Sequence, residues 1–139
     1  MSGSVWIIDT NVVVAGLLTA NNTSPVVRIV DGMLAAAFPF VISHALLAEY
    51  RAVLLRPAIR RTHRLTVVEL DTILTALARN AIVLASAAAP RAPDPGDQLL
   101  WDLLSARADL RLVTGDKLLL NNKPMRGRVV SPRKFVEAF

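Results

Sequence analysis

The residues of this sequence that are best suited to chemistry are acids that follow short apolar segments. Only 11 of the 139 residues are Asp or Glu. Four apolar runs are each followed by at least one acid. Asp9 follows the first run, Glu49 the second, Asp94 and Asp97 the third, and Asp116 the fourth. Scattered surface acids would instead favour helix faces, the places we assign to Asp71, Asp109 and Glu137. We therefore expect the acids that follow the runs to gather in one site.

Carboxylates gathered in this way need a cation, because like charges raise one another's pKa values. Oxygen ligands without nitrogen or sulfur partners favour Mg²⁺ or Mn²⁺ over zinc. Mg²⁺ prefers a few carboxylates together with water and substrate phosphate, so the site would stay open to a phosphodiester. The cation can activate a water molecule for in-line attack, alone or as one of a pair roughly 3.5–4 Å apart. The acids therefore predict metal-assisted hydrolysis without a protein nucleophile.

Other kinds of reactive site are excluded by composition. The sequence has no cysteine, so it forms no disulfide, no thiolate metal site and no cysteine nucleophile. Its two histidines, His44 and His63, stand far apart and form no paired zinc motif.

The apolar runs themselves predict the strands of a parallel sheet. We expect strands at five places: Val5 to Ile8, Phe38 to Ser43, Ala81 to Leu84, Leu110 to Val113, and Arg128 to Val130. Runs that do not alternate in polarity are typical of parallel strands that are covered on both faces. With helices between them, they predict an α/β fold, a three-layer α/β/α sandwich with a central parallel sheet of four to five strands. Ligands bind such sheets beyond the carboxyl ends of the strands, where these acids fall.

The intervening segments predict helices with recognisable starts. We expect them over residues 10–20, 25–37, 44–55, 67–80 and 97–108, and after Pro132. Ser24 with Pro25, and Ser43, are suited to begin the second and third of these helices. Thr66 and Glu69 match a capping box. The basic stretch from Arg56 to Arg64 should end the third helix, and residues 87–96, with three prolines, should form a loop.

Helical phase distinguishes among the acids. Glu49 falls at the border of an apolar stripe formed by Leu46, Leu47, Tyr50, Val53 and Leu54, which holds it near the core. Asp102 falls on the outward face of its helix, whereas Asp97 begins that helix near its apolar side. We therefore favour Asp97 over the alternative Asp94 as the third ligand.

Length and charge give the wider setting. A chain of 139 residues that is 53% hydrophobic predicts one domain over residues 1–139. The net charge of +5 suits a polyanionic partner. The sequence has no recognisable export signal and no apolar run of membrane-spanning length, so we expect a cytoplasmic protein without a membrane partner.

Taken in order, the motifs resemble those of PIN-domain ribonucleases, in particular the toxins of bacterial toxin-antitoxin pairs similar to the VapC type. The matching segments are IIDTNVVVAGLL, VISHALLAEYRAVLLRP, APDPGDQLLWDLL, LRLVTGDKLL and VVSPRKFVEAF, which span nearly the whole chain. The resemblance implies a PIN-like fold and a metal-dependent endoribonuclease. The implied ligands of Mg²⁺ or Mn²⁺ are Asp9, Glu49, Asp97 and Asp116. The sequence departs from the family at DPGDQ, where relatives often have more aspartates, and this keeps Asp94 open as a substitute for Asp97.

The same resemblance implies supporting residues and partners. Asn11 and Thr114 would orient the metal site, and Ser43 would have a lesser supporting part. The implied partners are an RNA substrate, a small cognate antitoxin protein and a second copy of the chain in a homodimer. Since an acidic cleft repels RNA, we expect basic residues to bind its phosphates: Arg56, Arg60, Arg61, Arg64 and Lys117.

Two other functions fit the same pattern less well. A Mg²⁺-dependent phosphatase of the haloacid-dehalogenase type would need an aspartate two residues after Asp9, where Asn11 stands. A catalytically silent module that binds RNA or an antitoxin would have no need of the four acids.

Overall fold

The structure is a computed structural model that describes residues 4–85, 97–122 and 127–138. Its elements follow one another in the order β1 (Val5–Ile8), α1 (Thr10–Leu18), α2 (Pro25–Leu34), β2 (Phe40–Ile42), α3 (His44–Leu54), α4 (Pro57–His63), α5 (Val67–Asn80), β3 (Ile82–Val83), α6 (Gln98–Leu104), β4 (Leu110–Val113), α7 (Lys117–Leu120), β5 (Val129–Val130) and α8 (Pro132–Glu137). Strands alternate with helices along the chain, as predicted.

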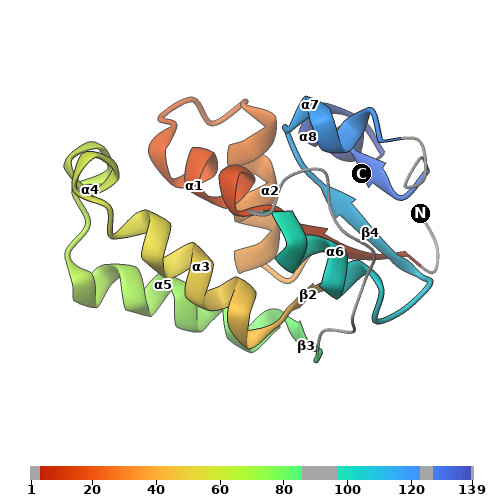
Figure 1. Ribbon diagram of the computed structural model, residues 1–139. Coiled ribbons are helices and arrows are strands. Elements are labelled where there is room, and N and C mark those ends of the chain that lie inside the picture. Colours follow the sequence, from red (N-terminus) through yellow and green to blue (C-terminus); the bar gives the residue numbers. More distant parts are fainter. Residues whose placement is uncertain (1–3, 86–96, 123–126, 139) are drawn as a thin grey trace.

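A five-stranded, all-parallel sheet lies at the centre of the fold, in the order β3-β2-β1-β4-β5. Helices pack on it to give the expected α/β/α sandwich (Figure 1). All four residues of β1 are buried, because this central strand has a neighbour on each side and helices on each face.

The strand order creates a switch point beside β1. From β1 the chain moves to β2 on one side, and it later returns to β4 on the other side. In open α/β sheets, the crevice beyond the carboxyl ends of two such strands is the usual place for a ligand. The carboxyl ends of β1 and β4 are therefore where a functional site is expected.

The predicted helix starts are confirmed, with one difference in detail. The Ser43 side chain accepts a hydrogen bond from the Leu46 N–H at 3.1 Å, which caps α3. Thr66 and Glu69 form the reciprocal bonds of a capping box at the start of α5. Ser24 is the N-cap residue of α2 with Pro25 in the first turn, but its side chain makes no capping hydrogen bond.

Several boundaries differ from the prediction. The basic stretch after α3 does end that helix, but most of it forms the separate helix α4. The second helix ends at Leu34, and Ala36 just beyond it adopts a left-handed conformation with φ of 53°. Helix α6 ends at Leu104 rather than at residue 108. The predicted loop at 87–96 lies outside the described residues.

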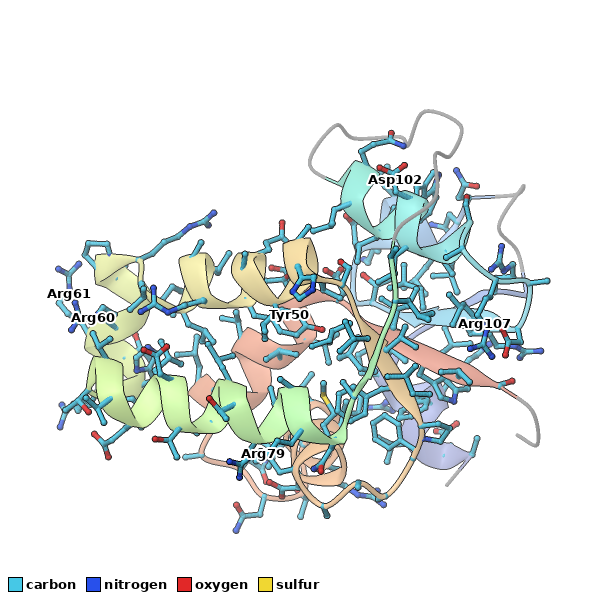
Figure 2. The ribbon with its side chains drawn as sticks, turned by 90° about the horizontal axis from the view of Figure 1, so that it is seen from below. Tyr50, Arg60, Arg61, Arg79, Asp102 and Arg107 are labelled. Atoms are coloured by element: carbon cyan, nitrogen blue, oxygen red, sulfur yellow. The ribbon has the colours of Figure 1, made fainter. Side chains whose placement is uncertain are left out.

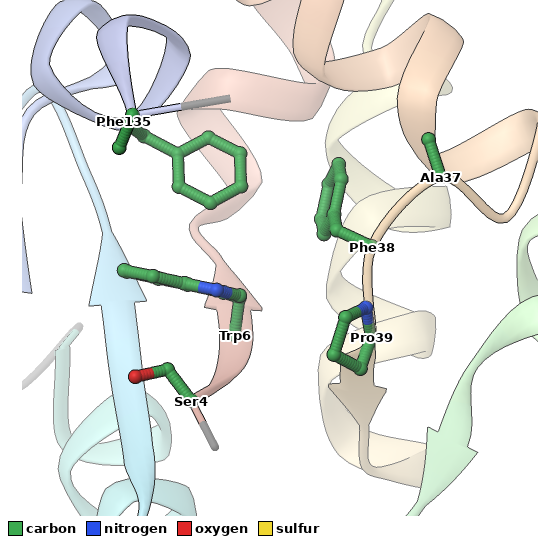
Figure 3. A pocket seen from close by; sticks show the side chains of 7 residues that line it. Ser4, Trp6, Ala37, Phe38, Pro39 and Phe135 are labelled. Atoms are coloured by element: carbon green, nitrogen blue, oxygen red, sulfur yellow. The ribbon is translucent and has the colours of Figure 1, made fainter. Parts of the chain in front are cut away.

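Three aromatic side chains pack against one another at the amino-terminal end of the sheet. The ring centroids of Trp6 and Phe135 lie 4.7 Å apart, and those of Phe38 and Phe135 lie 4.9 Å apart. These rings border an apolar cavity of about 400 Å³ (Figure 3). The cavity lies at the opposite end of β1 from Asp9, so it is not part of the site that the acids predict.

Within the part of the chain that the structure describes, no helix is long and apolar enough to cross a membrane.

Candidate metal centre

Strand register brings the first and last of the four predicted ligands, Asp9 and Asp116, to the same edge of the sheet. Ile8 of β1 is paired with Val113 of β4, so the next residues, Asp9 and Thr114, emerge side by side. The Thr114 hydroxyl donates a hydrogen bond of 2.6 Å to Oδ2 of Asp9. The same hydroxyl oxygen accepts the backbone N–H of Asp116 at 3.1 Å. Thr114 therefore links the first and last acids of the predicted set.

Asp9 is a buried carboxylate with an unfavourable environment for its charge. Its exposed fraction is 5%, and burial raises its pKa above the ordinary value. The negative charge of Glu49 raises this pKa further, whereas the hydrogen bonds from Thr114 and from the backbone of Asn11 and Thr10 lower it. Asp9 is also the N-cap residue of α1, so its carboxylate faces the backbone N–H groups of the first turn as well as the neighbouring acid.

Glu49 reaches the same place from α3. Its helix begins immediately after β2, and Glu49 lies half-buried at the border of the stripe whose fully buried members are Leu46, Tyr50 and Leu54. The Thr10 hydroxyl donates a hydrogen bond to Oε2 of Glu49. This contact joins the residue after Asp9 to an acid 39 positions later in the chain.

Tyr50, next to Glu49, forms a second connection between α3 and β1. Its side chain is fully buried, and its hydroxyl donates a hydrogen bond to the carbonyl oxygen of Ile8. Burial, and then the charges of Asp9 and Glu49, raise the pKa of Tyr50 well above its ordinary value. The hydroxyl therefore stays protonated and remains a hydrogen-bond donor.

The other two acids begin short helices. Asp97 is the N-cap residue of α6. Asp116 is the N-cap residue of α7, and its Oδ1 accepts the Leu118 N–H at 2.9 Å. For Asp116, a capping function thus accompanies any part in a metal site.

A polar cleft of about 270 Å³ collects the four predicted ligands. It is lined by Asp9, Thr10, Asn11, Glu49, Val53, Arg56, Asp97, Leu100 and Asp116. Within residues 4–85, 97–122 and 127–138, no three His, Asp or Glu side chains are placed closely enough to form a ready-made metal centre. The acids thus face one cleft without converging on one point. Asp94, the alternative to Asp97, lies outside the described residues.

The predicted supporting residues take different places. Asn11 is exposed and lines the cleft, and Thr114 is fully buried beneath it. Ser43 is not among the lining residues, and its hydroxyl caps α3. Its contribution is therefore to start the helix that carries Glu49.

The predicted RNA-binding arginines lie on α4 and at its two ends. Arg56 lines the cleft beside the acids. Arg60, Arg61 and Arg64 border a neighbouring hollow of about 380 Å³. Figure 2 shows Arg60 and Arg61 at the end of the molecule formed by α4. Lys117 is exposed at the start of α7 and does not line the cleft.

Other arginines have structural partners instead. Arg51 pairs with Asp71 at 2.8 Å, and Arg107 pairs with Asp109. The Arg128 guanidinium donates hydrogen bonds to the carbonyl oxygens of Leu104, Arg107 and Leu110. The Arg128 guanidinium therefore joins the segments around β4 to one another.

Comparison with known proteins agrees with this arrangement. The PIN domain family model matches residues 5–118, and the chain therefore belongs to the PIN domain family. PIN domains are generally nucleases and typically use divalent metal ions. A comparison with curated proteins finds no match.

Two residues of the site, Thr10 and Tyr50, were not predicted from the sequence. Thr10 follows Asp9 directly, so its position was a signal, but its bond to Glu49 depends on the packing of α3 against α1. Tyr50 was assigned to the apolar stripe, and its hydroxyl gave no separate signal. Long-range contacts of this kind are not visible in helical phase.

Proposed function

We propose that this PIN-domain protein is a divalent-metal-dependent endoribonuclease. The observation that supports the proposal most directly is the cleft at the carboxyl ends of β1 and β4, which is lined by Asp9, Glu49, Asp97 and Asp116. The four acids come from distant parts of the chain, and a fold without a cation would gain nothing by bringing them together.

The donor set of the cleft fits Mg²⁺ or Mn²⁺. All four candidate ligands are carboxylates, and the buried Asp9 has a raised pKa that a neighbouring cation would lower. Mg²⁺ commonly uses one or two protein carboxylates and keeps several waters, so the acids need not converge on one point. When bound, the cation would neutralise the acids, polarise the phosphodiester and activate water for attack.

The chain's own residues would orient these groups and hold the RNA. Thr114 fixes one oxygen of Asp9, and Thr10 fixes one oxygen of Glu49. Asn11 lines the cleft as a further polar group. Arg56 places a positive charge beside the acids, where a phosphate must approach a negatively charged cleft.

The basic residues outside the cleft would extend this contact along the RNA. We assign phosphate binding to Arg60, Arg61, Arg64 and Lys117, which are exposed. In the described residues, Arg60, Arg61 and Arg64 make no ion pair, unlike Arg51 and Arg107.

The biological setting proposed by resemblance is a cytoplasmic toxin of the VapC type. In this setting residues 1–139 act as one domain, the chain forms a homodimer, and a small cognate antitoxin silences it.

The decisive experiment measures RNA cleavage by the purified chain, free of any antitoxin, with Mg²⁺ or Mn²⁺. Asp9→Asn and Asp116→Asn should each reduce the rate by more than the roughly 10–100-fold that loss of an outer-shell partner costs. EDTA should abolish cleavage. The matched control is Asp31→Asn, which removes an exposed acid of α2 away from the cleft and should retain the parent rate.

The same assay identifies the third ligand, since only one of Asp94→Asn and Asp97→Asn should match the effect of Asp9→Asn. Cleavage that persists in EDTA, or in both Asp9→Asn and Asp116→Asn, would contradict the proposal. An intact chain that binds RNA and Mn²⁺ but never cleaves would instead indicate a silent binding module.

A further inference from the structure

Tyr50 connects α3 to the end of β1 by a hydrogen bond. Tyr50 has no exposed surface, and its hydroxyl donates a hydrogen bond to the Ile8 carbonyl oxygen. The donor, Tyr50, directly follows Glu49 in the chain, and the acceptor, Ile8, directly precedes Asp9. One hydrogen bond thus joins the two backbone segments that carry two candidate ligands.

This bond lies beyond the last register pair between β1 and β2, although Ile8 is still paired with β4. The register pairs between β1 and β2 are Trp6 with Phe40 and Ile7 with Val41, and Ile8 lies one residue beyond them. Helix α3 begins just after β2, so its position relative to β1 depends on contacts made beyond the ladder. The Tyr50 hydroxyl makes such a contact at this point.

A hydrogen bond between side chains alone would fix the separation of Glu49 and Asp9 less firmly. Among the described residues, the other side-chain hydrogen bond between these segments runs from the Thr10 hydroxyl to Glu49, and it involves the flexible end of the Glu49 side chain. The Tyr50 bond ends on a backbone carbonyl and starts from a ring with few rotatable bonds. It therefore restrains the helix as a whole rather than one carboxylate.

We propose that Tyr50 is a positioning residue for the metal centre, because its hydroxyl sets the spacing between Glu49 and Asp9. This inference rests on the proposed function, since it assumes that both acids hold the cation. Tyr50 itself touches neither substrate nor metal in this proposal. It acts by holding the two ligand-bearing segments at one separation.

The first test compares the parent chain with Tyr50→Phe, which keeps the ring and removes only the donor. Mn²⁺ affinity is measured by calorimetry, and RNA cleavage is measured against Mn²⁺ concentration. Loss of an outer-shell partner should raise the metal concentration for half-maximal cleavage by roughly 10–100-fold. The KM for RNA should stay unchanged, and the rate should recover at saturating Mn²⁺.

The control is Ser131→Ala, which removes one hydrogen bond, from the Lys134 N–H to the Ser131 hydroxyl, at the start of α8. It should lower the melting temperature while leaving Mn²⁺ affinity at the parent value. If Tyr50→Phe also loses only stability and binds Mn²⁺ as the parent does, the positioning role is wrong. If the parent itself binds no Mn²⁺, the role is equally wrong, because there is no centre to position.

A second measurement needs no substitution and therefore no refolding of a variant. Tyr50 is the only tyrosine in the sequence, so growth on 3-fluorotyrosine gives one fluorine resonance. This resonance should shift on Mg²⁺ titration with the midpoint seen for cleavage. A fluorine resonance whose chemical shift does not change at saturating Mg²⁺ would overturn the proposal. A resonance that shifts in a chain unable to cleave RNA would retain it and overturn the proposed function alone.

Discussion

At the scale of single residues, the cleft is defined by a carboxylate in an unfavourable place. Asp9 is almost fully buried, and both its burial and the charge of Glu49 raise its pKa. A fold that keeps a buried acid without a positive partner loses stability when that acid ionises. Such a cost is expected where the charge serves a ligand, and it makes Asp9 a sensitive probe of the site.

The raised pKa of Asp9 predicts the sign of a stability change. A group with a raised pKa in the folded state contributes stability that is fully present below its unfolded pKa of about 3.9 and is lost as the pH rises through the folded value. Asp9→Asn should therefore raise the melting temperature of the metal-free protein at pH 7.5. Near pH 3, where the carboxyl is protonated in both states, the difference should disappear.

Mg²⁺ should reverse the order of stability at pH 7.5. A ligand at 100 times its dissociation constant stabilises a folded protein by about 2.7 kcal/mol. The parent chain should gain this stabilisation from Mg²⁺, whereas Asp9→Asn should not. The matched control is Asp109→Asn, because the ion pair with Arg107 lowers the pKa of Asp109, so its removal should destabilise at neutral pH. If Asp9→Asn proves less stable than the parent in EDTA at pH 7.5, the charge of Asp9 is not costly.

At the scale of elements, the sequence predicts what depends on local pattern. Strands β1 and β4 have the predicted bounds, since both are short, continuous apolar runs, and the capping box at Thr66 starts α5 where expected. Helix α4 was missed because its seven residues are mostly basic and polar and show no apolar period. Helix α7 was missed because a single turn is too short to show one.

The end of α6 shows a long-range effect on a local boundary. The pattern from residue 97 continues to 108, but the helix ends at Leu104. The guanidinium of Arg128 donates hydrogen bonds to the carbonyl oxygens of Leu104, Arg107 and Leu110, so it is used within the fold rather than for RNA. The partner lies 24 residues beyond Leu104 in the chain. A contact of that range cannot be inferred from helical propensity.

Arg128 should therefore contribute to stability rather than to RNA binding. Hydrogen bonds from charged groups contribute about 1.5–3 kcal/mol each, and Arg128→Gln should lower the free energy of unfolding by about 2–3 kcal/mol because it removes a shared set of them. Arg133→Gln, at an exposed position of α8, should stay within about 0.5 kcal/mol of the parent. Urea unfolding measures both. A stable Arg128→Gln variant with weakened RNA binding would contradict this assignment.

At the scale of the whole molecule, charge is distributed unevenly around the cleft. The net charge is +5, yet the candidate centre is acidic, so an approaching RNA must be held mainly by residues beside it. Arg56 lies in the cleft, and the arginines of α4 continue from it around the neighbouring hollow. This continuity distinguishes them from basic residues elsewhere on the surface, which contribute only to the overall field.

The distinction predicts different salt dependences for variants of equal charge. Arg60→Gln with Arg61→Gln removes two charges from α4, and Arg28→Gln with Arg133→Gln removes two from exposed positions of α2 and α8. Binding of a single-stranded RNA is measured in EDTA from low to high salt. Each lost phosphate contact should lower the slope of log K against log salt by about 0.7, so the α4 pair should lose about 1.4. The control pair should keep nearly the parent slope, because it changes the net charge equally without removing a contact. Equal losses for both pairs would mean that α4 binds no phosphate and that RNA responds only to the total charge.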